Sequence, residues 1–368
     1  MDELIAWGLL TTELTHKHEV YFLTTDGVDI VKELIGMDQY VFDPKKKRVR
    51  RGYFWASELM IIPRNINHQI MLNQFYIDFI KNIDIEHKYY DEKYITDFID
   101  IRPDGLIKVG EVDYFIETDM NTEGTKQLRE KWDNYRRFLT GNRHKHKKIV
   151  VLFQIENAAN PKTRIALVKN SVVKEIIDLI GDDFDIVVDT RENLIKYLKR
   201  NLIEKRETLR LAKETLENQG FYFKDGDELS KYVGGTRFKY YLRKLNPDAT
   251  IKIEENRVQE YVMDSYLDKE MHVINHMYYL LTSNQYYKEI VGRNLPLIVL
   301  CNDLKETYED LKTVNMVGFK NVYFTTLERL QEFKFFEALT QIDEYGCIVN
   351  YTDMGLSKCK FLCKIEDL

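Results

Sequence analysis

The sequence has little of what marks secreted, disordered or membrane-spanning chains. It has 4 cysteines and 6 prolines in 368 residues, and it lacks a run of about 18 apolar residues, which a transmembrane helix needs. The N-terminus, MDELIAWGLLTTE, lacks the basic start of a secretory signal. Because the few cysteines cluster in the last fifth of the chain, their thiols are expected to be reduced. We therefore expect a globular protein of the cytoplasm.

An excess of positive charge is missing as well. The chain has 54 Lys and Arg against 60 Asp and Glu, a formal net charge of −6. This balance excludes a protein that is basic over its whole surface, so contact with a polyanion has to come from local basic segments. The length allows two or three domains, and a hydrophobic content of 44% is enough for well-buried cores.

Two local segments are basic enough to contact a phosphate backbone. The first, PKKKRVRRG at 44–52, contains six candidate DNA-binding residues: Lys45, Lys46, Lys47, Arg48, Arg50 and Arg51. The second, NRHKHKK at 142–148, contains four more: Arg143, His144, Lys145 and Lys147. The alternative for both segments is a solvated loop whose charges hold no ligand.

Residues 1–43 are predicted to form a partial winged-helix-like element. LIAWGLL suits the end of a helix, LTTELTHKHEVYFLTTDG suits a wing hairpin, and VDIVKELI suits the helix after it. The earlier helices of such a module have no counterpart in the sequence. The alternative is therefore a plain strand–turn–helix cap.

The stretch RPDGLIKVGEVDYFIETDM at 102–120 is predicted to form a β-hairpin. Gly110 and Glu111 suit a two-residue type II′ turn, in which glycine takes the first central position. Such a turn places Val109 opposite Val112. The register of the whole hairpin follows from this one pair.

Three acids share one face of the predicted hairpin. Counting back from the turn places Asp104 opposite Glu117, and directly opposed residues share a face. Asp119 lies two residues further along the strand, so it shares that face too. The other face is apolar and is expected to pack on the core: Ile107, Val109, Val112, Tyr114 and Ile116.

A helix and further strands are expected after the hairpin. TEGTKQLREKWDNYRRFLTG has apolar residues at helical spacing, with Lys131 on the flank of the apolar face. KKIVVLF at 147–153 is typical of a buried strand, which completes a strand–strand–helix–strand (ββαβ) core. Helices are expected at about 162–180 and, after the strand FDIVVD, from 190 to about 218. The apolar face of the first helix consists of Leu128, Trp132, Tyr135 and Leu139.

Three carboxylates on one face repel each other unless a cation lies between them. Oxygen ligands suit Mg²⁺ or Mn²⁺, and such an ion activates a water and neutralises charge on a phosphate. A lysine nearby would steady the nucleophile or the developing phosphate charge. The acids Asp104, Glu117 and Asp119 are therefore candidate ligands of a divalent ion.

The motif itself resembles a known nuclease pattern. PD, twelve intervening residues and ETD on a ββαβ frame look like the PD-(D/E)xK nuclease superfamily. The resemblance implies that Asp104 and Glu117 are the two motif acids. The lysine expected two places later is replaced by Asp119. Because some members carry that lysine on the following helix, Lys131 or Lys126 is the candidate for its catalytic role.

A second resemblance covers more of the chain, about residues 1–200. YFLTTDG, NHQIMLNQFY, RPDG, FIETDMNTEG and LREKWDNYRRFL occur in an order that resembles the bacterial replication-relaxation family. The resemblance implies a role in plasmid replication, DNA relaxation or conjugative mobilisation, and a relation to the C-class mobilisation relaxases. The implied partners are DNA and relaxosome or replication proteins.

An internal repeat is predicted at a spacing of about 144 residues. NPDATIKIEENRVQEYVMDS at 246–265 resembles the acidic hairpin, and LPLIVLC resembles KKIVVLF. In this comparison the second copy keeps Asp248, while Tyr261 and Met263 fall where acids would be needed. His272 and His276 follow four apart on a predicted helix, a spacing that suits either a metal or a plain polar face.

The predicted fold is α/β, with tandem duplicated restriction-endonuclease-like domains after the winged-helix-like remnant. The nuclease-like domain is expected at 44–203, a helical linker at 204–240 and a degenerate second copy at 241–368. The predicted function is metal-dependent nicking or relaxation of plasmid or mobile-element DNA. The alternatives are a DNA-binding replication or transcription regulator without catalysis, and a relaxosome accessory protein.

Overall fold

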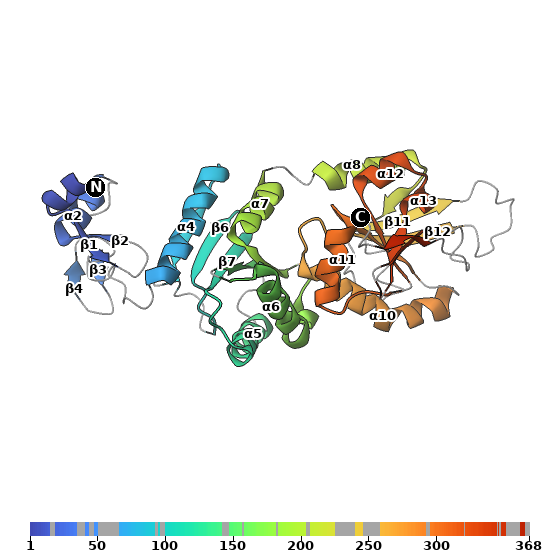
Figure 1. Ribbon diagram of the computed structural model, residues 1–368, viewed down its shortest axis with the longest axis horizontal. Helices are drawn as coiled ribbons and strands as arrows, with labels where there is room; N and C mark the ends of the chain where they lie inside the picture. Colours follow the sequence, from blue (N-terminus) through green and yellow to red (C-terminus); the bar gives the residue numbers. More distant parts are fainter. Residues whose placement is uncertain are drawn as a thin grey trace. The chain divides into compact units, whose positions relative to one another are not determined.

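A computed structural model of the chain is drawn in Figure 1. The chain divides into two compact units, Met1–Gln74 and Phe75–Leu368. Within the described part of the chain, no helix is both long and apolar enough to cross a membrane. The structure describes residues 1–14, 19–34, 41–43, 48–50, 66–92, 95, 100–141, 147–156, 158–181, 183–203, 207–224, 240–245, 258–291, 295–319, 321–343, 345, 347–350 and 361–364.

The first unit contains a short helix, a hairpin, a second helix and a second small hairpin. The predicted hairpin is present, because β1 and β2 pair antiparallel with Leu10 opposite Leu23. The predicted helix after it is confirmed as α2. The winged-helix assignment stays a prediction. The elements are α1 (Asp2–Ala6), β1 (Leu10–Leu14), β2 (Glu19–Leu23), α2 (Thr25–Leu34), β3 (Val41–Asp43) and β4 (Arg48–Arg50).

The start of α2 requires a glycine. The hydroxyl of Thr24 accepts a hydrogen bond from the Gly27 amide at 3.1 Å and donates one to the Gly8 carbonyl at 2.6 Å. A Cβ on Gly27 would lie 2.0 Å from the carbonyl oxygen of Leu9. The helix therefore reaches the turn before β1 only because residue 27 has no side chain.

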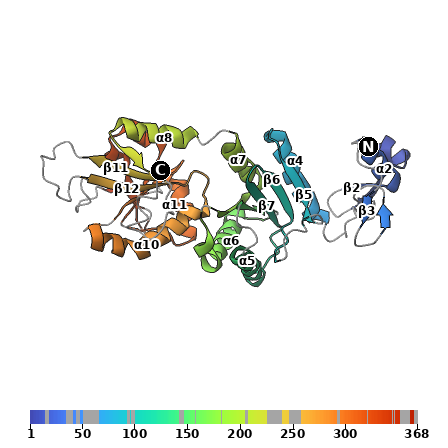
Figure 2. The same cartoon turned by 180° about the vertical axis from the view of Figure 1, so that it is seen from behind.

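Helix α4 (Ile66–Asn82) leads into the first sheet of the second unit, whose order is β5-β6-β7-β8-β9. The pairs β5–β6 and β6–β7 are antiparallel, and β7, β8 and β9 run parallel. Helices α5 and α6 cover one face, and α4 and α7 cover the other (Figures 1 and 2). The bounds are β5 (Lys88–Asp91), β6 (Gly105–Val109), β7 (Val112–Asp119), α5 (Thr125–Thr140), β8 (Lys148–Ile155), α6 (Pro161–Glu175), the 3-10 turn η3 (Ile177–Leu179), β9 (Phe184–Thr190) and α7 (Arg191–Leu202).

The acidic hairpin has the predicted turn and register. Val109 lies opposite Val112, and Gly110 has φ +53°, as the first position of a type II′ turn requires. The expected apolar face is buried except for Val112, which is half-buried, and the acid-bearing face is buried too, because Leu106 and Phe115 pack there against α5. On α5, Leu128, Trp132 and Tyr135 are buried as predicted; Phe138 is buried where Leu139, only half-buried, was expected.

The second sheet has the order β10-β11-β12-β13-β14-β15-β16-β17. Its first five strands repeat the directions of β5 to β9: two antiparallel pairs, then two parallel pairs. The helices also fall at the same places in the order, with α8, α10, α11 and α12 taking the places of α4, α5, α6 and α7. The bounds are α8 (Glu207–Asn218), β10 (Tyr222–Lys224), β11 (Tyr240–Leu245), β12 (Val258–Ser265), α10 (Met271–Val291), β13 (Leu297–Leu300), α11 (Leu304–Thr313), β14 (Val322–Thr325), α12 (Leu327–Glu332), α13 (Phe335–Ala338), β15 (Thr340–Ile342), β16 (Cys347–Asn350) and β17 (Phe361–Lys364).

The expected hairpin of the second copy is corrected. Tyr261 lies opposite Leu242 of β11, not opposite Asp248, because β11 ends at Leu245, before the NPD sequence. Asp248 lies outside the described residues. Tyr261 and Met263 pack on the face covered by α8, α12 and α13, so they do not occupy the counterpart of the acid face.

The single long helix expected from 190 to 218 is also corrected. Helix α7 ends at Leu202, and α8 is a separate helix that begins at Glu207. The predicted linker at 204–240 therefore includes α8 and β10. The buried α8 residues Leu209, Ala212 and Leu216 lie in one hydrophobic cluster with β12, β13 and α12.

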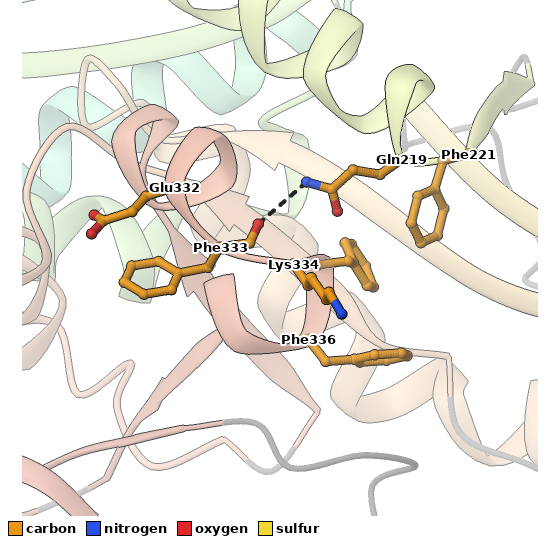
Figure 3. Close-up of a pocket in the computed structure, with 7 residues that line it drawn as sticks. Gln219, Phe221, Glu332, Phe333, Lys334 and Phe336 are labelled. Atoms are coloured by element: carbon orange, nitrogen blue, oxygen red, sulfur yellow. Dashed lines mark hydrogen bonds between the residues drawn. The ribbon is translucent and has the colours of Figure 1, made fainter.

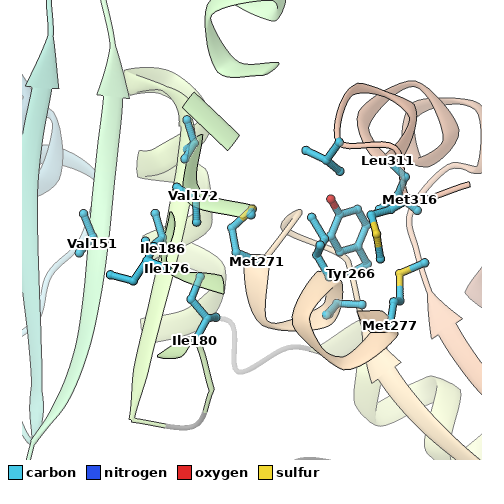
Figure 4. Close-up of a cluster of buried hydrophobic side chains, with 14 of the residues drawn as sticks. Val151, Val172, Ile176, Ile180, Ile186, Tyr266, Met271, Met277, Leu311 and Met316 are labelled. Atoms are coloured by element: carbon cyan, nitrogen blue, oxygen red, sulfur yellow. The ribbon is translucent and has the colours of Figure 1, made fainter. Parts of the chain in front are cut away.

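One hydrophobic cluster joins the two sheets of the second unit. Val151, Val172 and Ile186 come from the first sheet and its helices, and Met271 and Leu311 come from the helices of the second (Figure 4). All five are at most 1% exposed. Burial of a large apolar side chain contributes about 1.5–3 kcal/mol, so this shared core binds the two sheets firmly.

Polar contacts cross the same joint. The wholly buried Lys169 of α6 bonds both carboxylate oxygens of Asp310 in α11, at 2.7 and 2.9 Å. The His272 imidazole of α10 bonds Asp185 of β9 at 2.7 Å. Further contacts are Arg200 with Asp268, the Asn170 amide with the Thr313 carbonyl, and the Asn275 amide with the Ile180 carbonyl.

Candidate acid–lysine site

Asp104 lies just before β6, where the hairpin opens. Its carboxylate accepts a hydrogen bond from the Thr118 backbone amide at 2.7 Å. The pairing of β6 with β7 reaches Gly105 and Ile116, and Asp104 and Glu117 are the next residues along the two segments. The predicted juxtaposition of these two acids is therefore present in the structure.

Glu117 is 4% exposed and bonds two side chains of α5. Lys131 donates to one carboxylate oxygen at 2.7 Å, and the Tyr135 hydroxyl donates to the other at 2.6 Å. Burial raises the pKa of Glu117; Lys131 and Tyr135 oppose this effect, and the nearby Asp104 adds to it. A carboxylate in this position gains from a nearby cation, because its own burial disfavours the charge.

Lys131 links the pocket to the loop after β7. Its ammonium lies 2.7 Å from Glu117 and 2.8 Å from Glu123, and it lies over the Phe153 ring at 5.1 Å. Burial lowers the pKa of Lys131, but Glu117, Glu123 and Asp104 outweigh it, so the pKa is raised above its usual value. Lys131 therefore keeps its proton and its charge at neutral pH.

Asp119, the third predicted acid, is placed differently. It is 0% exposed, and its Oδ2 accepts a hydrogen bond from Arg164 Nε at 2.5 Å. The Oδ1 atom is buried and has no hydrogen-bond partner. Arg164 comes from the first turns of α6 and also donates to the Glu123 carbonyl at 2.7 Å. An arginine, rather than open space, therefore faces Asp119.

A polar pocket of about 480 Å³ opens onto two of the three acids. Asp104, Glu117 and Lys131 line it, and Asp119 does not. Carboxylate oxygens on a solvent-accessible polar wall are the donors that Mg²⁺ or Mn²⁺ takes, usually with several waters retained. Of the three predicted ligands the pocket presents Asp104 and Glu117, and both Glu117 oxygens already accept hydrogen bonds from α5. The rest of the lining consists of Ile95, Asp100, Ile101, Arg102, Gln127, Glu130, Asn134 and Tyr135.

The protein side chains alone supply a small ligand set. Among the described residues, no group of three or more His, Cys, Asp or Glu is arranged to hold a metal ion. His272 and His276, the predicted pair on α10, each bond an aspartate instead, Asp185 and Asp264.

Of the remaining predicted residues, the structure describes the side chains of Lys126 and Lys147, and neither lines the pocket. The Lys126 side chain is 88% exposed and approaches Glu130 at 3.8 Å, so of the two candidate lysines only Lys131 reaches Glu117. Lys147 approaches Asp113 at 3.9 Å, at the opposite end of β7. The backbone of β4 includes Arg48 and Arg50. The other basic candidates lie outside the described residues: Lys45, Lys46, Lys47, Arg51, Arg143, His144 and Lys145.

Three residues of the site were missed by sequence reasoning. Tyr135 was assigned to the apolar face of α5, and its hydroxyl instead orients Glu117. Glu123 follows the acidic strand and gave no signal beyond its charge. Arg164 lies 45 residues after Asp119, so no local spacing connects them.

The second sheet presents a related pair at the matching place. On the face covered by the helix after the strand, β7 presents Glu117 and β12 presents Asp264, next to Val262. Asp264 bonds His276 of α10, as Glu117 bonds Lys131 of α5. Asp264 and His276 are 2% and 3% exposed. Each sheet therefore holds a buried carboxylate against a basic side chain of the following helix.

A second pocket, of about 470 Å³, lies in the second sheet's half and is mainly aromatic (Figure 3). The ring centroids of Phe221 and Phe335 lie 4.3 Å apart with the rings tilted by 43°, and Phe333 is 37% exposed. The Gln219 amide donates to the Phe333 carbonyl at 3.3 Å. The two phenylalanines Phe221 and Phe335 belong to the core below, so the pocket is a surface hollow over that core.

Comparison with known proteins gives one family match. The family model described as replication-relaxation matches residues 1–152. This range includes the first unit, the acidic hairpin and α5, and it ends inside β8. No curated protein and no solved structure matches the chain.

Proposed function

We propose that the chain processes DNA in the replication or mobilisation of a plasmid or other mobile element, and that it nicks DNA with the help of a divalent cation. The observation that carries the proposal is the pocket in which Asp104 and Glu117 lie beside Lys131. This pocket falls in the range that matches the replication-relaxation family.

The side chains of the pocket divide the chemistry between them. Asp104 and Glu117 would hold Mg²⁺ or Mn²⁺, which supplies an activated water and neutralises charge on the scissile phosphate. Lys131 stays protonated and offers a positive charge to the phosphate oxygens. The Tyr135 hydroxyl orients Glu117 by donating a hydrogen bond to its carboxylate. Phosphate contacts away from the pocket are assigned to the two basic segments at 44–52 and 142–148.

The lysines provide the test of catalysis. Lys131→Met should reduce the rate of plasmid nicking in Mn²⁺ by at least about tenfold, because a group that stabilises the transition state is lost. Lys126→Met is the matched control, since its side chain is exposed on the same helix, and it should nick at the wild-type rate. Full activity of Lys131→Met in a folded protein would remove the lysine from the mechanism.

DNA binding is tested on the first basic segment. Neutralising Lys46, Arg48 and Arg50 together should weaken binding to any sequence and reduce the salt dependence of the affinity. Fluorescence anisotropy with a labelled duplex at several salt concentrations measures both quantities. An unchanged affinity and salt slope would place the DNA elsewhere on the chain.

A second candidate function is DNA binding without catalysis, as a replication or transcription regulator or a relaxosome accessory protein. It is favoured by the ion pairs that already engage Glu117 and Asp119. Assays on the wild-type protein distinguish the two candidate functions. A regulator would bind DNA equally well in EDTA and would leave supercoiled plasmid intact at any Mn²⁺ concentration.

The second sheet, in this proposal, is a degenerate copy of the first, on an endonuclease-like frame. The shared strand order, the shared strand directions and the pair Asp264–His276 in the place of Glu117–Lys131 support the duplication. The copy would stabilise the first sheet through the joint described above. The His276 side chain is buried and bonds Asp264 of β12, so it is not expected to bind an ion.

A further inference from the structure

Asp119 is predicted from the sequence to bind the ion, but in the structure its carboxylate accepts a hydrogen bond from Arg164. Asp119 is 0% exposed, and an isolated charge at such a place is costly unless a cation compensates it. Arg164 is 8% exposed and lies 2.5 Å from Asp119. The compensating cation is therefore part of the chain.

We infer that Arg164 occupies the place of a cation beside Asp119, so that the site binds one divalent ion at Asp104 and Glu117 rather than two. This inference rests on the divalent-ion site of the proposed function. Arg164 bonds the Oδ2 atom of Asp119, and the Oδ1 atom is buried away from the pocket, so neither oxygen is open to an ion from solvent. Asp119 is thus a positioning residue and not an ion ligand.

Arg164 acts on the pocket through a second contact. Its Nη2 donates to the Glu123 carbonyl at 2.7 Å, and the Glu123 carboxylate receives Lys131 at 2.8 Å. Arg164 therefore fixes both ends of the segment from Asp119 to Glu123. This segment includes Asn121, whose φ of +62° is a conformation that L-residues seldom adopt. Arg164 thus keeps Glu123 in the position where its carboxylate, like that of Glu117, pairs with the Lys131 ammonium.

The first test separates the three acids by Mn²⁺ binding, measured by titration calorimetry on the full chain. Asp119→Asn keeps an oxygen for Arg164 and should bind Mn²⁺ with the wild-type affinity and stoichiometry. Asp104→Asn and Glu117→Gln should weaken binding by at least about tenfold. Loss of Mn²⁺ binding in a folded Asp119→Asn protein would make Asp119 a ligand and would overturn the inference.

The second test removes the arginine and counts ions. Arg164→Met should bind one more Mn²⁺ than the wild type, because Asp119 then lacks its counter-ion. The double variant Arg164→Met/Asp119→Asn should lose this additional ion. Arg164→Lys, which keeps the charge, should return the count to that of the wild type. Circular dichroism shows which variants fold. If Arg164→Met does not fold, the Mn²⁺ titrations of the three acid variants decide the inference.

The ion counts distinguish the inference from the proposed function. One ion in the wild type and two in Arg164→Met support both. One ion in each leaves the proposed function standing and overturns the role of Arg164. No ion in the wild type and one in Arg164→Met removes the ion from the proposed function but supports the arginine as its substitute. No ion in either overturns both.

Discussion

The two sheets of the second unit place a similar pair of side chains in different surroundings. Glu117 meets Lys131 at the wall of a pocket of about 480 Å³, and the lysine side chain is 19% exposed. Asp264 meets His276 in the joint between the sheets, where the histidine side chain is 4% exposed. A carboxylate on the helix-covered face of the third strand can therefore line a pocket or lie in a packed joint.

The choice of base fits each setting. A lysine keeps its charge when carboxylates surround it, and that charge is available to an anion in the pocket. A histidine has a neutral form as well as a charged form, so its burial does not require the desolvation of a charge. Both sheets therefore hold a carboxylate–base pair, and the pair of the first sheet is the more exposed to solvent.

The largest effect is expected from removing the carboxylate in each sheet. Glu117→Gln should abolish nicking, by more than about 100-fold, because an ion ligand is lost. Asp264→Asn should leave nicking unchanged and should destabilise the protein by about 1–3 kcal/mol, the usual cost of disturbing a buried hydrogen bond. Nicking assays and urea denaturation measure the two quantities. Equal loss of nicking in both folded variants would contradict the division between the sheets.

The next effect concerns the joint itself. Lys169→Met should lower the free energy of unfolding by about 3–5 kcal/mol, because Asp310 would be left as an uncompensated buried charge. The pKa of Asp310 is lowered, since Lys169 outweighs the opposing effect of burial. Lys169→Met/Asp310→Leu should recover most of the loss. If the single variant is as stable as the wild type, this ion pair does not hold the sheets together.

A smaller effect is expected from pH at the same joint. The pKa of His272 is raised: burial lowers it, but Asp185 outweighs burial, and Asp264 and Glu270 add to the attraction. A group whose folded pKa is raised stabilises fully below its unfolded value, near 6.5, and loses this contribution as pH rises through the folded value. Thermal unfolding between pH 5.5 and 8.5 should show this fall in the wild type, and a flatter profile in His272→Asn.

The smallest effect is expected from Asp248. The repeat aligned it with Asp104, but Tyr261, the aligned counterpart of Glu117, lies opposite Leu242 and packs on the other face of its sheet, so no carboxylate pair is expected there. Asp248→Asn should leave nicking, Mn²⁺ binding and stability at wild-type values. Lost activity in a folded Asp248→Asn protein would require a role for the second half in the chemistry.

The predictable part of the site was local. The turn at Gly110 fixed the register of the hairpin, and from that register the approach of Asp104 to Glu117 followed. The apolar spacing of α5 then placed Lys131 one turn from Tyr135 and within reach of Glu117. Each of these inferences uses only the period of a strand or a helix, which the sequence displays directly.

The parts that failed depended on contacts between distant segments. Arg164 reaches Asp119 from another helix, and no period within the sequence reports that approach. The face of Tyr261 was misassigned because residues 246–257 intervene between β11 and β12, so a fixed spacing of about 144 residues selected the wrong partners. Asp264 could be recognised as the counterpart of Glu117 only after the covering helix was known.

The place where the family match stops has a practical consequence. Residue 152 lies within β8, which pairs with β7 on one side and β9 on the other in the first sheet, and α6 and β9 follow it in the chain. Trp132 donates from its indole to Ser171 of α6 at 2.7 Å, and Arg164 and Val168 come from the same helix. A fragment cut at residue 152 would expose this aromatic core and an unpaired strand edge, which invites aggregation.

The segment that sequence comparison recognises is thus smaller than the segment that must fold together. Expression of the acid–lysine site in isolation should begin with pieces that continue at least to the end of α7, at Leu202. Even such a piece would leave α6 and β9 without the α10 and α11 surfaces that cover them in the whole chain. The segment that the family model matches and the smallest segment that can fold around the site are therefore two different lengths of this chain.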